Sequence, residues 1–429
     1  MTNLKKCRLG ELIEVTRGAS LSGEYYSTKG EYIRLTCGNF DYRNNCFKEN
    51  TSKDNLFYTG EFRKEFLLEK DDIITPLTEQ AIGLLGTTAR IPESGKYIQS
   101  QDVALVKCKT GKIDPTFCYY LISSRLVRNQ LSAAAQQTKI RHTSPDKIKA
   151  CTVWIPELDE QRSIGRLLAS LDDKIQLNKR INDNLEAMAR QLYDYWFVQF
   201  DFPNEEGKPY KSSGGAMVWN EKLKREIPHG WSDCVLGDYI GRITNGLNPR
   251  KNFVLGSGNN YYVTIRSLVG TTIDWNNCDR CDDEALSKIN SRSQLQIGDI
   301  IFSAIGTIGR TYYILEEPTN WNISETSFTL RAKENVPNDF FYGMLRSNEI
   351  QIKADKAAMG STLRCLVMDS LCSLQYIEIP SYMMKLFAAK VSPLYRQIHR
   401  NNKEIAELTK QRDELLPLLM NGQASLNSD

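Results

Sequence analysis

The sequence predicts an α+β protein in which two mixed α/β domains form a tandem pseudo-repeat and are joined by two long antiparallel coiled-coil helices. Three observations support this prediction. Apolar residues recur at heptad spacing over residues 158–200 and again over 382–422. The segments that precede these stretches share several short strings, and both alternate β-branched or aromatic runs with Gly, Pro and polar turns. Such alternation is typical of compact domains that mix short strands and helices.

The two long helices are predicted from apolar residues at alternating steps of three and four, a spacing that requires a partner helix. We expect antiparallel pairing, because an internally duplicated chain closes most simply around a twofold axis. A helix of about 40 residues would be roughly 60 Å long. The predicted helix-pair seam consists of Ile164, Leu168, Leu171, Ile175, Asn178, Leu185 and Leu192 in the first helix and Val391, Leu394, Ile398, Asn401, Ile405, Leu408 and Leu415 in the second.

Two features of this seam leave alternatives open. Asn178 and Asn401 occupy matching positions, and they either fix the register of the pair, as polar seam residues do, or lie at a frayed part of the seam. Pro393 either kinks the second helix or marks its true start, with Ser392 as the N-terminal cap.

The first domain is expected at residues 1–157. Strand-like runs include EYIRLTCGNF, DDIITPL, TARI and DVALVKCK, and a helix is predicted over PTFCYYLISSRLVRNQL. Asp114 suits the cap of this helix and Pro115 its first turn. After the first long helix, residues 201–230 are rich in Gly, Pro, Ser and charge, which predicts a linker.

The second domain is expected at residues 231–381, because the first pattern restarts there. LGELI returns as LGDYI, DDIIT as GDIIF, LLGTTARI as AIGTIGRTYYI, FCYYLI as FFYGML and WIPE as EIPS, each about 225 residues later. Repetition in this order makes chance similarity an unsatisfactory explanation. Residues 423–429 are expected to form a flexible tail.

Composition narrows the class of protein. The chain has 429 residues, a net charge of +3 and 11 cysteines, an odd number that argues for reduced thiols. No apolar run approaches the roughly 18 residues of a membrane span, and the first ten residues do not resemble a signal peptide, so we expect a cytoplasmic protein with no membrane partner. Cys278 and Cys281 lack the second ligand pair of a structural zinc site, so no metal is expected.

A search for catalytic residues finds none. The chain contains neither GxxxxGK[ST] nor GxGxxG, and the Asn-Pro dipeptide at 248–249 is followed by Arg250 rather than by the Pro-aromatic pair of adenine methyltransferases. The three histidines have no nucleophile or carboxylate in a recognisable arrangement. We therefore expect a protein that recognises a partner and does not catalyse a reaction.

Polar loops between the predicted strands carry residue types that bind DNA. Arg and Lys bind guanine and phosphate, and Asn binds adenine. The simpler interpretation is that these loops are polar because water surrounds them. The candidate DNA-binding residues in the first domain are Arg17, Ser20, Tyr25, Asn39, Tyr42, Arg43, Asn44, Thr88, Arg90, Lys139 and Arg141. Those in the second domain are Arg242, Asn245, Asn248, Arg250, Lys251, Arg266, Thr307, Arg310 and Arg364.

Over nearly its whole length the chain resembles the specificity subunit of type I restriction-modification systems. The resemblance is carried by the domain-helix-domain-helix order, the helix entry IPELDEQRSI, the segment FDFPNEEGKPYKSSGGAMVWNEKLKREIPHGW, the string GDIIFSAIGTIGR and the closing LLPLLMNGQ. The second helix entry, IPSYMMKLF, departs from the usual Glu-Gln pattern, which weakens the expectation of identical partner contacts at the two helices.

The resemblance implies a non-catalytic subunit with two target-recognition domains. Each would read one half of a bipartite site in double-stranded DNA, and the spacer helices would set the half-site separation. It also implies two methyltransferase subunits that bring S-adenosylmethionine and two restriction subunits, the motor-nucleases, that use ATP and Mg²⁺. No cofactor is expected in this chain. The alternative is a helical assembly scaffold that does not contact DNA.

Overall fold

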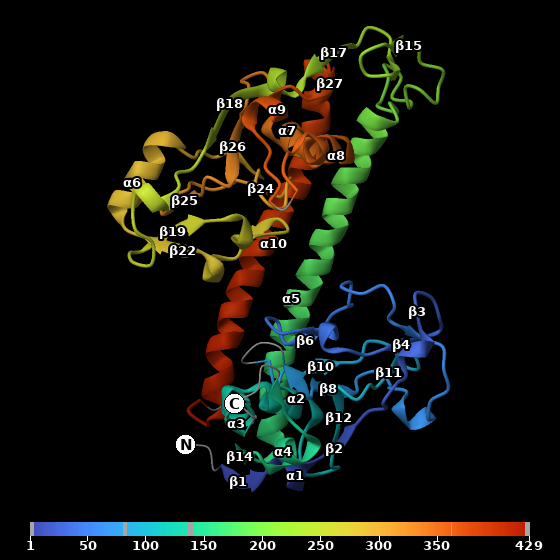
Figure 1. Ribbon diagram of the computed structural model, residues 1–429, viewed down its shortest axis with the longest axis vertical. Coiled ribbons are helices and arrows are strands. Elements are labelled where there is room, and N and C mark those ends of the chain that lie inside the picture. The colour runs from blue at the N-terminus through green and yellow to red at the C-terminus, as the bar shows by residue number, and fades with distance from the viewer. Residues whose placement is uncertain (1–3, 80–83, 135–140, 362, 425–429) are drawn as a thin grey trace. The chain divides into compact units, whose positions relative to one another are not determined.

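The computed structural model describes residues 4–79, 84–134, 141–361 and 363–424. The chain divides into two compact units, of which unit 1 combines residues 1–176 with 406–429 and unit 2 is residues 177–405. Each unit contains one globular head (Figure 1). We call residues 4–157 head 1 and residues 231–380 head 2.

Head 1 is built around a four-stranded antiparallel sheet. Its strand order is β10 (Ala89–Arg90), β8 (Ile73–Pro76), β12 (Val103–Cys108) and β2 (Ile13–Arg17). Along β12, Ala104 and Val106 belong to one hydrophobic core, and Val103 and Leu105 to another. The first four residues of the strand, VALV, are all apolar because both faces of the sheet are covered there.

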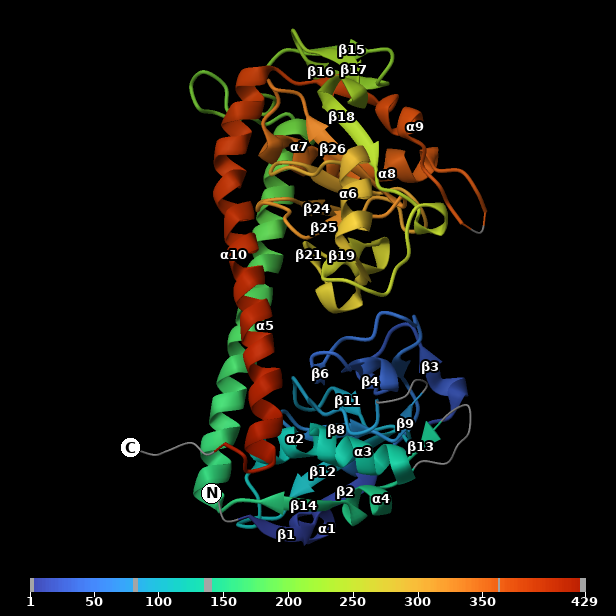
Figure 2. The same cartoon turned by 90° about the vertical axis from the view of Figure 1, so that its left-hand side faces the viewer.

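Two layers cover this central sheet. One face packs against α2 (Pro115–Ser123), α3 (Arg125–Ala134) and the long helix α5 (Leu158–Tyr193) (Figure 2). The other face packs toward a second sheet in the order β11 (Tyr97–Ile98), β4 (Tyr32–Arg34), β7 (Phe57–Tyr58) and β3 (Tyr26–Ser27). The remaining elements of head 1 are β1 (Lys5–Arg8), α1 (Leu9–Leu12), the hairpin β5 (Phe40–Asp41) and β6 (Cys46–Phe47), β9 (Thr78–Glu79), β13 (Arg141–His142), α4 (Pro145–Ala150) and β14 (Thr152–Ile155).

The helix predicted after Asp114 begins where expected but is interrupted. The Asp114 carboxylate accepts hydrogen bonds from the backbone N–H groups of Thr116 and Phe117, each over 2.9 Å, and Pro115 is the first helical residue. The helix ends at Ser123, and a second helix, α3, starts at Arg125. One predicted helix is therefore two, separated by Ser124 in an extended conformation.

Head 2 repeats this layered design. Its central sheet has the order β18 (Ile240–Asn245), β26 (Ser327–Ala332), β23 (Ile300–Ser303) and β24 (Thr311–Tyr313), and a second sheet has the order β22 (Asp279–Cys281), β19 (Asn260–Val263) and β25 (Trp321–Ile323). Ile300 and Phe302 face the core shared with the helices, whereas Ile301 faces the core shared with the second sheet. The other elements are β17 (Ser232–Val235), the hairpin β20 (Leu268–Val269) and β21 (Thr272–Ile273), α6 (Asp283–Arg292), α7 (Asn338–Leu345), α8 (Asn348–Ala357), α9 (Met368–Cys372) and β27 (Gln375–Glu378).

The sequence repeat corresponds to a structural repeat. DDIIT lies in β8 and GDIIF in β23, and FCYYLI lies in α2 and FFYGML in α7. In head 1 the first strand, β1, pairs antiparallel with β14, and in head 2 the first strand, β17, pairs antiparallel with β27. Each head also contains one parallel pair at the equivalent place, β4 with β11 and β19 with β25.

The long helices α5 and α10 (Ser381–Met420) each contribute to both units, and α5 continues as a π-helical turn, Asp194–Val198. Within unit 2, Asn178 Nδ2 donates to Glu404 over 2.8 Å, and Asn401 Nδ2 donates to Asn182 over 2.8 Å. Partner numbers fall as numbers along α5 rise, so the helices are antiparallel in this unit. The fourteen predicted seam residues are all buried or half-buried.

Two expectations about these segments are corrected. Helix α10 runs without interruption through Pro393, whose side chain is exposed, so Pro393 does not mark the helix start and Ser392 is not its cap. The predicted linker contains a hairpin of β15 (Met217–Asn220) and β16 (Arg225–Pro228), and its Phe202 and Ile227 are buried in the core of unit 2. Most of the predicted tail, residues 425–429, lies outside the described residues.

Candidate nucleic-acid interface

The first long loop of each head starts from a glycine that allows two backbones to touch. A Cβ atom on Gly18 would lie 2.2 Å from the carbonyl oxygen of Gln99, and one on Gly246 would lie 1.8 Å from that of Ile323. Only glycine fits such close approaches. The loops that carry many of the candidate residues therefore leave the two scaffolds at equivalent, fixed points and differ only beyond them.

In head 1, some candidate residues reach the surface. Arg17 is exposed, and its Nε atom donates to the carbonyl of Gln101 over 2.8 Å. The Tyr25 ring is 44% exposed and lies edge-on against Tyr58, with ring centroids 6.0 Å apart. The exposed candidates of head 1 are Arg17, Ser20, Tyr25 and Arg43.

Other head 1 candidates are used inside the protein. Thr88 is buried, accepts a hydrogen bond from Asn45 Nδ2 over 2.9 Å and donates to the carbonyl of Tyr119 over 3.0 Å. Asn39 is buried as well, and its Oδ1 accepts from the backbone N–H of Thr36 over 2.9 Å. The half-buried candidates are Tyr42, Asn44 and Arg90. Lys139 lies outside the described residues, and only the backbone of Arg141 is described, in β13.

The half-buried residues shape the β5–β6 hairpin. Asn44 Nδ2 donates to Asp41 over 2.6 Å, and the Tyr42 hydroxyl donates to the carbonyl of Cys37 over 2.8 Å. Burial raises the pKa of Tyr42, so this hydroxyl remains a neutral donor. The Arg90 guanidinium donates to Thr116 over 2.9 Å and lies over the Tyr119 ring. As DNA contacts, these residues stay a prediction, and their present contacts hold the loops in place.

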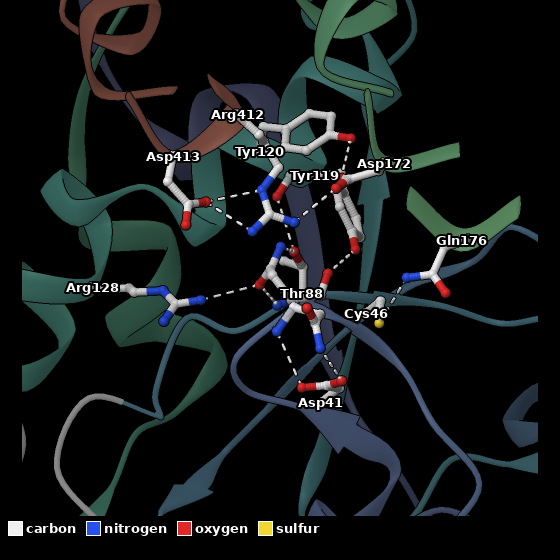
Figure 3. A network of polar contacts seen from close by, with 12 residues as sticks. Asp41, Cys46, Thr88, Tyr119, Tyr120, Arg128, Asp172, Gln176, Arg412 and Asp413 are labelled. Atoms are coloured by element: carbon white, nitrogen blue, oxygen red, sulfur yellow. Dashed lines mark hydrogen bonds and ion pairs between the residues drawn. The ribbon is translucent and has the colours of Figure 1, made fainter. Parts of the chain in front are cut away.

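Beside this hairpin, head 1 has a basic pocket of about 510 Å³. Four arginines line it, from the hairpin turn, from α3 and from α10: Arg43, Arg125, Arg128 and Arg412. Figure 3 shows that Arg128 points toward the Thr88 region, while Arg412 lies between the carboxylates of Asp172 and Asp413. The pocket therefore combines cations with hydrogen-bonding side chains.

Head 2 presents its candidates more openly. Arg250, Lys251 and Arg266 are exposed, and none of the three has a side-chain hydrogen bond or ion pair to another described residue. Thr307 is exposed, and Arg310 is exposed while donating to the carbonyls of Ile265 and Leu268, each over 3.1 Å. The half-buried candidates of head 2 are Arg242, Asn245, Asn248 and Arg364.

The half-buried candidates of head 2 have protein partners. Asn245 accepts from the Arg292 guanidinium over 2.6 Å, and Asn248 Nδ2 donates to Glu325 over 2.8 Å. Arg242 donates to the carbonyl of Arg292 over 3.2 Å. Arg364 forms an ion pair with Asp355 over 2.7 Å. Sequence reasoning placed all of these on polar loops, whereas Arg242 and Asn245 lie in strand β18. It also could not separate the free cations from those bonded within the head.

Head 2 also has a pocket beside its hairpin, of about 440 Å³. Arg190 of α5, Arg310 and Arg346 line it together with Gln351 of α8. Both pockets are lined by arginines, but their other lining residues differ.

Two further cation and aromatic pairs were not predicted as sites. The Arg34 guanidinium lies 3.7 Å from the Tyr26 ring centroid in head 1, and Arg280 lies 3.7 Å from the Tyr261 ring centroid in head 2. Arg34 is buried, whereas Arg280 is exposed. The paired residues lie on different strands, β3 and β4 in head 1 and β19 and β22 in head 2, so no local motif indicates them.

Neither a metal site nor a membrane span is found in the described part of the chain. Among those residues, no three or more His, Cys, Asp and Glu side chains are grouped so that they could hold a metal ion. Burial raises the pKa of both Cys278 and Cys281, which keeps these thiols protonated. No described helix has both the length and the apolar character needed to cross a membrane.

These features define a tandem-domain protein with two heads of one architecture and two divergent loop surfaces. Residues 1–187 match the family described as the type I restriction modification DNA specificity domain. The MjaIX specificity subunit of Methanocaldococcus jannaschii is 27% identical over 314 residues, which cover 72% of this chain and 68% of that protein. The chain is therefore similar to type I restriction-modification specificity subunits over most of its length, and its first 187 residues match their DNA specificity domain.

A second relative and one solved structure extend the comparison. The HindI specificity subunit of Haemophilus influenzae is 21% identical over 378 residues, covering 76% of this chain and 81% of that protein. A crystal structure of a type I restriction-modification S subunit from M. genitalium aligns with 99% of this chain and 97% of its own, with a TM-score of 0.57 and 15% identity. At that identity the likeness concerns the fold.

Proposed function

We propose that this chain supplies the DNA sequence specificity of a type I restriction-modification complex, with each head reading one half of a bipartite site in double-stranded DNA. The observation that carries the proposal is the repeat itself. Matching strands and helices build both heads, whereas the polar loops at equivalent positions differ. Two domains that share one scaffold but bind different DNA sequences are expected to have matching strands and helices and different loops.

The exposed loop residues have the chemistry for such reading. Arginine can bind guanine with two hydrogen bonds in the major groove, and Lys and Arg neutralise phosphates. Arg250, Lys251 and Arg266 are available for this in head 2, because no described protein group binds their side chains. In head 1, Arg17 and Arg43 are the exposed arginines among the candidates.

We further propose that α5 and α10 set the half-site separation and bind two methyltransferase subunits. In unit 2, α5 carries a second apolar stripe besides the buried seam: Leu177, Ile181, Met188, Tyr195 and Val198, each between 37% and 54% exposed. Apolar residues at this near-heptad spacing suit a partner helix. The methyltransferase subunits would bring S-adenosylmethionine, and two restriction subunits would bring ATP and Mg²⁺. This chain would hold no cofactor and perform no catalysis.

The test uses the chain purified with its methyltransferase subunits. Methylated adenines are mapped for the wild type and for two double variants, Arg17→Ala with Arg43→Ala and Arg250→Ala with Lys251→Ala. Each double variant should relax or lose only one half-site. In binding titrations, removal of a side chain that binds one phosphate should reduce the slope of log affinity against log salt by about one.

A control and an opposing outcome make this test decisive. Lys211→Ala removes an exposed cation from the segment between α5 and head 2 and should change neither the half-sites nor the salt slope. Equal loss of both half-sites in each double variant would contradict the modular assignment. Failure of the wild-type complex to bind duplex DNA would favour the alternative, a helical scaffold that does not contact DNA.

A further inference from the structure

The loop 248–258 of head 2, NPRKNFVLGSG, displays one aliphatic side chain to solvent. Val254 is 79% exposed. A single exposed aliphatic residue is ordinary on a protein surface and needs no explanation by itself. The neighbours of Val254 make this position unusual, because they fix the loop and place two free cations on it.

Apolar anchors hold the loop on both sides of Val254. Phe253 and Leu255 pack against the small buried cluster that includes Tyr262 and Ile289. The Phe253 and Tyr262 rings meet edge-on, with centroids 5.6 Å apart. Since the residues before and after it turn inward, Val254 turns outward.

Hydrogen bonds fix the two ends of the same loop. Asn248 Nδ2 donates to Glu325 over 2.8 Å, and Asn248 Oδ1 accepts from the backbone N–H of Arg250 over 2.9 Å. At the far end, the backbone N–H of Gly256 donates to the carbonyl of Arg280 over 2.8 Å. A loop held in this way loses little conformational freedom when it binds, which favours a specific contact.

The two cations of the loop lie just before Val254 in the sequence. Arg250 and Lys251 form the end of a 3₁₀ turn, are exposed and have no side-chain partner among the described residues. Cations beside an apolar group complement the major groove of DNA, where phosphates flank the base edges. The apolar group that a base edge offers there is the 5-methyl of thymine.

We infer that Val254 contacts the methyl group of a thymine in the half-site read by head 2, while Arg250 and Lys251 bind neighbouring phosphates. This inference rests on the proposed function. Val254 is short and β-branched, unlike the longer Phe, Leu or Met side chains that typically wedge between base pairs in the minor groove. Val254 would therefore determine specificity at one base pair of the half-site, where it would favour thymine because of its 5-methyl group.

The experiment measures affinity for the mapped target duplex by fluorescence anisotropy, using the complex with its methyltransferase subunits. Each thymine is replaced in turn by deoxyuridine, which removes only the methyl group. At one position, replacement should weaken wild-type binding about fourfold, the factor expected for one methyl group transferred out of water. Val254→Ala should bind the thymine duplex more weakly by a similar factor and show no further loss with deoxyuridine at that position.

Ile297→Ala is the matched control, because Ile297 is 56% exposed in the same head but lies outside the loop. It should keep the full response to deoxyuridine. A target site without such a thymine would overturn the inference, and so would equal deoxyuridine effects in wild type and Val254→Ala. A Val254→Ala loss of affinity that is the same for every DNA sequence would also overturn it, because a side chain wedged between base pairs would give that result. Absence of site-specific binding by the wild type would instead overturn the proposed function.

Discussion

Arg412 of α10 donates a hydrogen bond to Asp172 of α5 over 2.8 Å, and the Arg412 side chain is only 7% exposed. The hydroxyl of Tyr120, from α2 of head 1, donates to the same carboxylate over 2.7 Å (Figure 3). Burial, followed by the nearby Asp172 charge, raises the pKa of Tyr120, so the hydroxyl stays protonated. One carboxylate thus joins the two long helices to head 1 within unit 1.

Removing Arg412 should destabilise unit 1 strongly. Arg412→Met leaves the Asp172 carboxylate without its charged partner, and we expect a loss of about 3 kcal/mol in the free energy of unfolding. Tyr120→Phe should cost about 1 kcal/mol. Urea denaturation followed by circular dichroism measures both. Arg162→Ala, which breaks an exposed ion pair with Asp159, is the control and should cost under about 0.5 kcal/mol. An Arg412→Met loss as small as this would contradict the prediction.

The buried pair Asn182 and Asn401 should stabilise the helix pair only when both residues are present. Asn401→Leu removes the donor to Asn182 Oδ1, and we expect a loss of about 1 to 3 kcal/mol. The double variant with Asn182→Leu should recover that loss, because leucines suit an apolar seam. A double-mutant cycle of unfolding free energies measures the coupling. No loss in the single variant would favour the frayed seam over a register-fixing pair.

The carboxylate of Glu316 should make unit 2 sensitive to acid. Hydrogen bonding from Lys403, and then from His399, lowers the pKa of Glu316 below its ordinary value of 4.5. A lowered carboxyl pKa contributes stability above the unfolded value and loses it as the pH falls through the folded value. Glu316→Gln should therefore lower the melting temperature at pH 7, and this difference from wild type should shrink as the pH falls below 4.5. Glu317→Gln, which removes the neighbouring exposed carboxylate, should show no such pH-dependent difference.

Gly18 should be irreplaceable in head 1, because a Cβ atom would lie 2.2 Å from the carbonyl oxygen of Gln99. Gly18→Ala should lower the free energy of unfolding by about 2 kcal/mol, because the added Cβ atom overpacks this contact and one backbone must move, and it should impair only the half-site of head 1. Gly23→Ala is the control in the same loop, since its nearest neighbour would be the Tyr26 ring at 3.8 Å. Thermal unfolding measures the loss of stability, and mapping of methylated adenines measures the change in the half-site. Equal behaviour of the two variants would contradict the close-approach argument.

Insertion of one heptad into each long helix should lengthen the spacer of the target site. Seven residues add about 10 Å of helix, close to three base pairs of duplex. The insertions belong after Gln176 and after Ile405, at the boundary between the units. Adenine mapping reads the new spacer directly. An unchanged spacer would exclude the helices as the measuring element, and an insertion into one helix alone should disturb the seam and serves as the control.

The strands and helices were predictable because the sequence patterns that indicate them are local or occur in both halves of the chain. DDIIT and GDIIF read as buried strands and are β8 and β23, and Asp114 with Pro115 correctly predicted the start of α2. Pro393 left two alternatives, a kink or the helix start, and the uninterrupted helix α10 excludes the helix start. The hairpin β15–β16 was missed because its strands are short and lie in a segment rich in turn-forming residues.

The candidate interface was harder to predict, for a physical reason. A buried polar group must find a hydrogen-bonding partner, and the sequence does not show which polar loop residues are buried. Thr88 and Asn39 look like loop residues free to bind DNA but hold the loops of head 1 together. Arg250 and Lys251 are cations like Arg242 and Arg364, yet only the first two have side chains without a described partner.

The core of unit 1 includes Leu419 and Met420 of α10, which are 2% exposed and pack with residues of head 1. During synthesis, most of head 1 leaves the ribosome before unit 2, but Leu419 and Met420 of its core are translated after unit 2. Unit 2 is formed by one continuous segment and can mature earlier. A chain released before residue 419 would therefore have a folded second head and an incomplete core in the first head. Its exposed apolar core residues would mark the truncated chain for degradation.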